Sequence, residues 1–268
     1  MSEWIKVIIL GIVEGITEFL PISSTGHLIV TAAVLDFQNS LGGTFEIFIQ
    51  LGAVIAVLFY YSQDLLQQVR EVPRNRNVQH FWLSIVVATI PAVILGLLLR
   101  QWIKAVLYSP TVVAISLIVG GIVFLLVERR PRQHVDVQGV KNISLRQALT
   151  IGLIQTIAFI PGVSRSGASI IGGMSTGLDR KTATEFSFYL AIPTLGGATI
   201  LELLDVINSL SGTDLAQFIL GAVISAVVAW LSIGFLLRYI SSNTFKPFGY
   251  YRIAAGLIIL VLVAGNIL

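Results

Sequence analysis

The hydrophobic positions of this 268-residue chain gather into long apolar stretches that short polar loops separate. A helix needs about 20 residues, at about 1.5 Å of rise each, to cross the hydrocarbon core of a bilayer. Six stretches meet this length and predict membrane-spanning helices over residues 43–62, 80–99, 110–128, 182–204, 215–238 and 249–268. The pattern therefore predicts an all-α polytopic membrane protein with six transmembrane helices.

Two further apolar segments, residues 4–36 and 145–178, are interrupted in the middle by Pro and a short polar loop. Each half of such a segment is too short to span a membrane alone. Non-helical backbone at membrane depth must be buried in protein or line a water-filled cavity. We therefore interpret both segments as re-entrant helix–loop–helix hairpins.

The two interrupted segments also match each other in spacing. Gly11 and Gly152 are 141 positions apart, and Pro21 and Pro161 are 140 positions apart. Each half of the chain would hold one hairpin and three spans, and an odd number of spans turns the second half upside down. We predict one integral membrane domain, residues 1–268, built as an inverted-topology repeat of residues 1–128 and 145–268, with the working site between the halves.

The composition agrees with a membrane protein, since 55% of residues are hydrophobic, 12% are charged and the mean hydropathy is +0.88. The pI of about 9.3 does not indicate nucleic-acid binding, because the basic residues lie in short loops rather than along one face. There is no cysteine, which excludes disulfides and thiolate metal sites. The N-terminal segment lacks the basic leader and cleavage site of a signal peptide.

Loop charges predict the orientation in the membrane. When the six spans alternate, only Lys6, Arg100 and Lys104 fall on one side. The positive-inside rule makes the other side cytoplasmic and places both termini outside. The first hairpin then enters from the outer side and the second from the cytoplasmic side. The cytoplasmic set is Arg70, Arg74, Arg76, Arg129, Arg130, Arg132, Lys141, Arg146, Arg180, Lys181, Arg238, Lys246 and Arg252.

The first hairpin carries two acids, Glu14 and Glu18, which lie one helical turn apart on the same face. Ionisable groups at membrane depth are costly and are usually functional. Two such carboxylates either share a proton or hold a cation, and beside a phosphate they favour a hard divalent ion such as Mg²⁺ or Ca²⁺. The structural alternative is a single Glu that serves as a hydrogen-bonding group between helices.

The loop that follows brings hydroxyl groups, an imidazole and free backbone N–H groups to the start of a new helix, which is a typical anion site. It contains Ser23, Ser24, Thr25, Gly26 and His27. His27 is a candidate general acid, general base or phosphate ligand, and the sequence does not choose among these roles. A structural histidine bonded to a backbone carbonyl, and simple N-caps at Ser23 or Thr25, are the alternatives.

The loop of the second hairpin contains Ser164, Arg165, Ser166 and Gly167. The planar guanidinium of Arg165 matches two phosphate oxygens, and small neighbouring residues let the backbone approach an anion. An arginine at this depth needs a negative partner, for which the acids of the first hairpin are candidates. A bare ion pair is the alternative to a phosphate site.

The stretch from Glu14 to His27, taken with Pro161–Gly167, resembles the undecaprenyl-diphosphatase (bacitracin-resistance) family over essentially the whole chain. The resemblance implies hydrolysis of the C55 lipid diphosphate to the monophosphate and inorganic phosphate on the outer face of the bacterial cytoplasmic (inner) membrane. It also implies a divalent cation, recycling of the carrier lipid for peptidoglycan synthesis and cell-wall biogenesis, and bacitracin resistance. Ala168-Ser169 stands where the family often has Ala-Thr, so a hydroxyl is kept.

The family's acidic pair falls on Glu14 and Glu18, which are the expected metal ligands, and Ser24 or a water is the nucleophile. The expected partners are a prenyl diphosphate lipid and the bilayer, and the oligomeric state stays open, a homodimer included. The alternative function is a transporter or flippase of the lipid carrier or of a small anion, since inverted repeats also build transporters. The expected catalytic residues are Glu14, Glu18, Ser24, His27 and Arg165, and the expected substrate-binding residues are Ser23, Thr25, Gly26, Ser164, Ser166 and Gly167.

Overall fold

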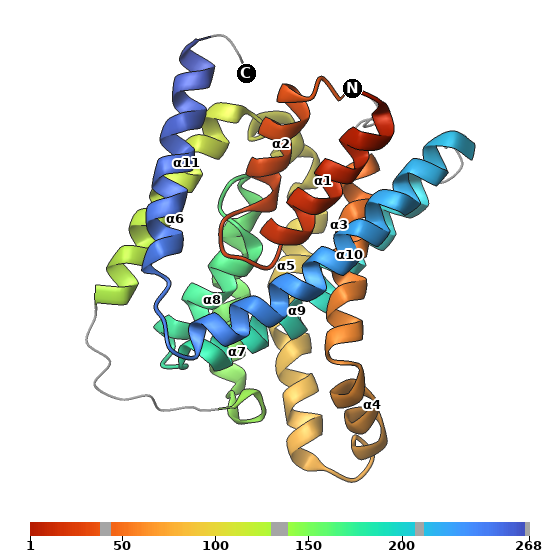
Figure 1. Ribbon diagram of the computed structural model, residues 1–268. Helices are drawn as coiled ribbons and strands as arrows, with labels where there is room; N and C mark the ends of the chain where they lie inside the picture. Colours follow the sequence, from red (N-terminus) through yellow and green to blue (C-terminus); the bar gives the residue numbers. More distant parts are fainter. Residues whose placement is uncertain (38–43, 130–138, 207–211, 266–268) are drawn as a thin grey trace.

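The chain folds into a bundle of helices, and the computed structural model describes residues 1–37, 44–129, 139–206 and 212–265 (Figure 1). Within these ranges the secondary structure is helical throughout, with no strand. The α-helices are α1 (Glu3–Thr17), α2 (Ser24–Val34), α3 (Thr44–Tyr60), α4 (Ser62–Glu71), α5 (Arg76–Val106), α6 (Pro110–Arg129), α7 (Leu145–Gln155), α8 (Arg165–Ser175), α9 (Arg180–Val206), α10 (Gly212–Ile240) and α11 (Lys246–Ala264), and the 3₁₀ turns are η2 (Val140–Asn142) and η3 (Thr156–Phe159).

Five of the described helices are long and apolar enough to cross a membrane: α5, α6, α9, α10 and α11. A sixth span results when α3 and α4 are counted together, although the chain bends by 65° between them. Large apolar side chains such as Leu97, Leu98 and Val261 remain exposed on the outside of these helices. An outward apolar surface of this kind fits a lipid environment, and the protein is a multi-pass membrane protein.

The first predicted span differs from the observed helix at its end. Helix α3 ends at Tyr60, and the chain turns into the short polar helix α4, where the sequence predicted a span to residue 62 followed by a loop. Residues such as Asp64 and Arg70 explain the bend, because charged side chains cannot continue into the hydrocarbon core. The predicted ends at residues 43 and 268 lie outside the described residues.

Both interrupted segments form helix–loop–helix hairpins. Helix α1 packs on α2, and α7 packs on α8, with none of the four helices longer than 15 residues. Figure 1 places the N-terminus and the end of α11 at one end of the molecule and the turn between α4 and α5 at the opposite end. The boundaries of the two sequence repeats, at residues 1–128 and 145–268, stay a prediction.

The hairpins pack in a reciprocal way on the long helices. Helix α1 lies against α10, and α7 lies against α5. At Gly11 a Cβ atom would come within 2.8 Å of the Gly221 carbonyl oxygen in α10, and at Gly152 within 2.3 Å of the Ala88 carbonyl oxygen in α5. Glycine at these two equivalent positions therefore lets each hairpin approach its neighbouring helix at backbone distance.

Candidate functional site

The loops of the two hairpins meet in the interior of the bundle. The Ser166 hydroxyl at the start of α8 donates to the Leu20 carbonyl of the first loop at 3.2 Å. Phe19 of the same loop packs edge-on against Phe188 of α9, with 5.2 Å between ring centroids. Residues that lie more than 140 positions apart in sequence are thus brought into one buried cluster, which we call the loop interface.

An ion pair crosses the loop interface. Arg165 Nη2 donates to Glu18 Oε1 at 3.0 Å, and both side chains are largely buried. Arg165 Nη1 donates to the Ser187 carbonyl at 3.0 Å, while the guanidinium carbon lies 5.6 Å from the Phe19 ring centroid. The predicted pairing of the arginine with an acid of the first hairpin is therefore observed, and the acid is Glu18.

Ser24 uses the other oxygen of the same carboxylate. Its hydroxyl donates to Glu18 Oε2 at 2.6 Å, and both residues are buried. A hydroxyl within hydrogen-bond distance of a carboxylate has the geometry that a nucleophile and its base require. Glu18 thus lies between a hydroxyl and a guanidinium, with one oxygen directed to each.

Both loops reach their second helix through a serine with positive φ. Ser23, which precedes α2, has φ 73°, and Ser164, which precedes α8, has φ 75°. Such backbone is strained for a residue with a side chain and costs of order 1–3 kcal/mol, and strain of this kind clusters at functional sites. The matching φ values show that Ser23 and Ser164 share one backbone conformation at the start of their helices.

Ser164 differs from Ser23 in its side chain. The Ser164 hydroxyl accepts from the Gly167 N–H at 3.1 Å and lies 3.0 Å from the Ser166 hydroxyl, whereas the Ser23 side chain makes no capping bond. Ser169 lies one turn further along α8, and its hydroxyl is 2.7 Å from that of Ser187. Two pairs of hydroxyl groups, Ser164 with Ser166 and Ser169 with Ser187, therefore lie around Arg165.

His27 is held on both sides of its ring. Its Nδ1 lies 2.7 Å from the Ser23 carbonyl, and its Nε2 lies 2.6 Å from the Tyr251 hydroxyl of α11, whose ring stacks on the imidazole. Since a carbonyl only accepts, Nδ1–H is the donor, and in the neutral ring Nε2 accepts from the tyrosine. The carbonyl bond matches the structural role considered for this histidine, and Nε2 still faces a proton donor.

Glu14 is the acid that the loop interface leaves without a partner. It is fully buried, and neither of its oxygens has a hydrogen-bond partner among the described residues. A buried carboxylate with free oxygens fits a cation ligand, because an unpaired charge at this depth is otherwise costly. No cluster of three or more His, Asp or Glu side chains that could hold a metal occurs in the described part of the chain, so any ligands beyond a pair of carboxylates would come from phosphate or water.

Thr25, Gly26 and Gly167 complete the predicted set. Thr25 is half-buried next to Ser24, and Gly26 is buried on the side of α2 that meets α6. A Cβ atom at Gly26 would lie 3.0 Å from Val113, and one at Gly167 would lie 3.3 Å from the Arg252 guanidinium. The small residues thus allow close packing beneath the loops rather than contact through side chains.

One predicted position is wrong. Arg252 was expected among the cytoplasmic loop charges, but it lies inside α11, is fully buried and donates to carbonyl groups of both loops. Sequence reasoning also missed Ser187 and Tyr251, which contact Arg165 and His27. A lone polar residue in an apolar helix gives no sign of the direction in which its side chain points.

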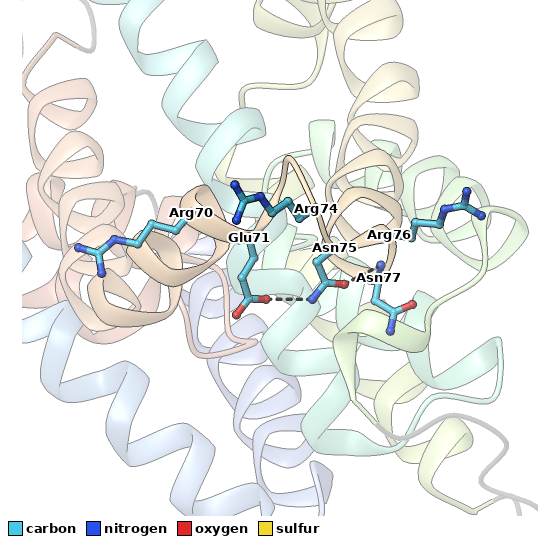
Figure 2. Close-up of a pocket in the computed structure, with 6 residues that line it drawn as sticks. All are labelled: Arg70, Glu71, Arg74, Asn75, Arg76 and Asn77. Atoms are coloured by element: carbon cyan, nitrogen blue, oxygen red, sulfur yellow. Dashed lines mark hydrogen bonds between the residues drawn. The ribbon is translucent and has the colours of Figure 1, made fainter.

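A hollow at the turn between α4 and α5 has a volume of about 530 Å³ and is drawn in Figure 2. Two residues that line it are linked, since Asn75 Nδ2 donates to Glu71 Oε2 at 3.0 Å. The guanidinium groups of Arg70, Arg74 and Arg76 point in different directions. The site that the sequence predicted lies elsewhere, at the loop interface.

The fold and the loop interface define an all-α polytopic membrane protein with a buried polar site between its two hairpins. The family model described as "Bacitracin resistance protein BacA" matches residues 7–258, and the chain belongs to this family. A protein of Deinococcus radiodurans named undecaprenyl-diphosphatase is 50% identical over 269 residues, covering 99% of this chain and 97% of its own. A protein of the same name from Deinococcus deserti is 48% identical and covers 99% of this chain and 98% of its own length. Another from Acidovorax ebreus is also 48% identical and covers 96% of this chain and 94% of its own length.

Proposed function

We propose that this protein hydrolyses undecaprenyl diphosphate to undecaprenyl phosphate and inorganic phosphate at the outer face of the bacterial cytoplasmic membrane. The reaction would recycle the carrier lipid for peptidoglycan synthesis and confer bacitracin resistance. The observation that carries the proposal is the buried chain from Ser24 through Glu18 to Arg165, which joins a hydroxyl, a base and a phosphate-binding cation across the two hairpins.

Arg165 and the two helix starts would hold the diphosphate. A guanidinium binds two phosphate oxygens at once, and a helix N-terminus favours an anion, so the starts of α2 and α8 would add N–H donors at the same place. Phosphoryl transfer depends mostly on positioning and on electrostatic stabilisation of the equatorial oxygens. Ser164 and Ser166 add hydroxyl donors at the edge of this position.

Ser24 is the proposed nucleophile. Its oxygen would form a bond to the terminal phosphorus, the bond from that phosphorus to the bridging oxygen would break, and undecaprenyl phosphate would leave. The hydroxyl proton would pass to Glu18, which already accepts it in a hydrogen bond. Water would then hydrolyse the serine phosphate, release inorganic phosphate and restore Ser24; direct attack by a water on the same phosphorus is the other route.

A divalent cation, Mg²⁺ or Ca²⁺, would be held by Glu14, with Glu18 as the second candidate ligand. Glu14 has two free oxygens, whereas both oxygens of Glu18 are already hydrogen-bonded. When bound, the ion would neutralise charge on the diphosphate oxygens. Mg²⁺ commonly uses one or two carboxylates and completes its shell with substrate phosphate and water, which suits so small a protein ligand set.

The assay that tests this function measures phosphate release from a prenyl diphosphate by the purified protein in detergent. Arg165→Ala and Glu18→Gln should each lower turnover by at least 100-fold, because each removes one part of the buried chain. Arg238→Ala, which changes an exposed arginine at the end of α10, is the matched control and should leave turnover unchanged.

Near-normal phosphate release in both site variants would show that the assignment of the site is wrong. A wild-type protein that binds prenyl diphosphate but releases no phosphate would instead favour the transporter, which moves a substrate without breaking it.

A chelator tests the cation. Phosphate release by the wild type should fall at least tenfold in EDTA and return when excess Mg²⁺ or Ca²⁺ is added. Glu14→Gln removes the unpaired carboxylate and should raise the Mg²⁺ concentration needed for half-maximal activity. Activity that is the same with and without chelator would contradict the proposed requirement for a divalent cation.

A further inference from the structure

Arg252 of α11 forms hydrogen bonds to the backbone of both loops. Its Nη1 donates to the Pro21 carbonyl of the first loop at 3.0 Å. Its Nη2 donates to the carbonyls of Gly162 and Val163 in the second loop at 3.0 Å and 2.9 Å. The guanidinium is therefore a single rigid plane that touches the backbone of both loops.

Helix α6 completes the surroundings of this guanidinium. The Ser116 and Leu117 carbonyls lie 3.4 Å and 3.5 Å from Arg252 nitrogens, and the ring centroid of Phe124 lies 5.9 Å from the guanidinium carbon. Among the described residues no carboxylate lies within ion-pair distance of Arg252, so its partners are carbonyl oxygens and an aromatic face. A fully buried charge with such partners is costly, and its position therefore requires a reason.

The backbone of the second loop is shaped to meet this arginine. Gly162 has φ 93°, and a Cβ atom there would lie 2.5 Å from the Val113 carbonyl oxygen of α6. Only glycine fits this backbone at this distance, and the resulting turn directs two consecutive carbonyls at one nitrogen of Arg252. Pro21 lies two residues before Ser23, and Val163 lies directly before Ser164, so the contacts sit next to the strained serines.

We propose that Arg252 is a positioning residue that sets the spacing between the two loops, so that Ser24 and Glu18 on one loop stay aligned with Arg165 on the other. This inference rests on the proposed function. The guanidinium fork provides donors in several fixed directions, while a lysine ammonium is a point charge on a flexible stem. A misplacement of about 1 Å at a reacting centre can cost about 100-fold in rate, so a loosened loop interface should appear in kcat.

The test uses Arg252→Gln and Arg252→Lys in the full-length protein, with the exposed Arg238→Gln as the matched control. Three quantities are measured: kcat and KM for phosphate release from a prenyl diphosphate, thermal unfolding in detergent, and amide hydrogen exchange of peptides covering residues 18–24 and 161–167. Arg252→Lys keeps the buried positive charge, so it separates the loss of charge from the loss of the fork and remains informative if Arg252→Gln does not fold.

We expect kcat to fall about 100-fold in Arg252→Gln and at least tenfold in Arg252→Lys, with KM within threefold of the wild type. Exchange should accelerate in both loop peptides and stay unchanged in α3 and α9. Arg238→Gln should match the wild type in every measurement.

Wild-type kcat in the folded Arg252 variants, or unchanged exchange in either loop, would overturn the proposal. A second contrary result is hydrogen exchange that accelerates throughout the protein while the folded fraction of the variant turns over at the wild-type rate. That result would also overturn the proposal, because it would show that Arg252 only stabilises the fold. Absence of phosphate release in the wild type would refute the proposed function, and the loop exchange would still decide whether Arg252 positions the loops.

Discussion

Two arginines near the loop interface occupy different electrostatic positions. Arg165 lies against a carboxylate and a carbonyl and keeps Nε without a hydrogen-bond partner, whereas Arg252 contacts carbonyl oxygens and the ring of Phe124. The first can exchange a ligand, because a phosphate oxygen can replace a carboxylate oxygen at the same nitrogen. Among the described residues the second donates only to backbone carbonyls, so under the proposed function Arg165 would bind substrate while Arg252 would position the loops.

Tyr251→Phe tests the contact that holds His27. The change removes the hydroxyl that lies 2.6 Å from Nε2 and keeps the ring that stacks on the imidazole. A net hydrogen bond contributes about 1 kcal/mol, which corresponds to about fivefold in rate, so kcat should fall by about this factor if Nε2 acts in the reaction. This change in kcat is measured by steady-state phosphate release from a prenyl diphosphate.

Tyr250→Phe is the matched control for that variant, since Tyr250 is the exposed neighbour on the same turn of α11. It should keep the wild-type kcat. Equal turnover in the two tyrosine variants would remove His27 Nε2 from the reaction.

The sequence predicted most of the residues at the loop interface because their spacing is local. Glu18 and Ser24 lie within one turn and loop, so a motif contains both. The sequence did not predict Tyr251 and Arg252 as members of the site. The direction of a side chain on an apolar helix depends on how that helix is rotated in the bundle. The same reason hid Ser187, which is a single polar residue in the apolar part of α9.

At the scale of elements, close approach of helix backbones fixes where the hairpins sit. Gly11 and Gly152 occupy equivalent places in α1 and α7, and each lets its helix meet a carbonyl of a long helix. Hydropathy located the long helices from sequence because length and apolar content are enough to define a span. It did not locate α4, because a short helix with polar residues on most sides reads as a loop.

Gly152→Ala should destabilise the protein because the new Cβ would lie 2.3 Å from the Ala88 carbonyl oxygen and force α7 away from α5. Overpacking of this kind costs typically about 1–3 kcal/mol. Thermal unfolding in detergent should therefore show a lower midpoint than that of the wild type.

Gly197→Ala is the control for that substitution, since Gly197 also lies inside a long helix and a Cβ atom there would meet nothing within 4 Å. Its midpoint should equal or exceed that of the wild type, because alanine favours helix. Equal midpoints for the two alanine variants would show that the packing of α7 on α5 is not tight.

At the scale of the whole molecule, the two ends of the bundle differ in charge. The turn between α4 and α5 carries three arginines, while the opposite end carries the N-terminus and the end of α11 (Figure 1). From the positive-inside rule we predict that the arginine-rich end lies in the cytoplasm. The hairpin of α1 and α2 would then open toward the outer face, where the lipid diphosphate is proposed to react.

The cysteine-free sequence makes this orientation directly measurable. Ser2→Cys and Asn77→Cys each introduce one exposed thiol, at the N-terminal end and at the α4–α5 turn. A membrane-impermeant maleimide should label Ser2→Cys in right-side-out vesicles and Asn77→Cys only in inverted vesicles. The reverse pattern would place the first hairpin on the cytoplasmic side, and the parent chain without thiols controls for background labelling.

The ion pair between Arg165 and Glu18 has a consequence for turnover under the proposed reaction. The carboxylate is tethered beside the guanidinium, so it acts as a competitor at high local concentration for every anion that enters. Inorganic phosphate therefore has to hold its place against Glu18 once the lipid has left, and the returning carboxylate displaces it. Under the proposed reaction, Glu18 would thus limit inhibition by the phosphate product, but it would also weaken binding of the substrate diphosphate to Arg165.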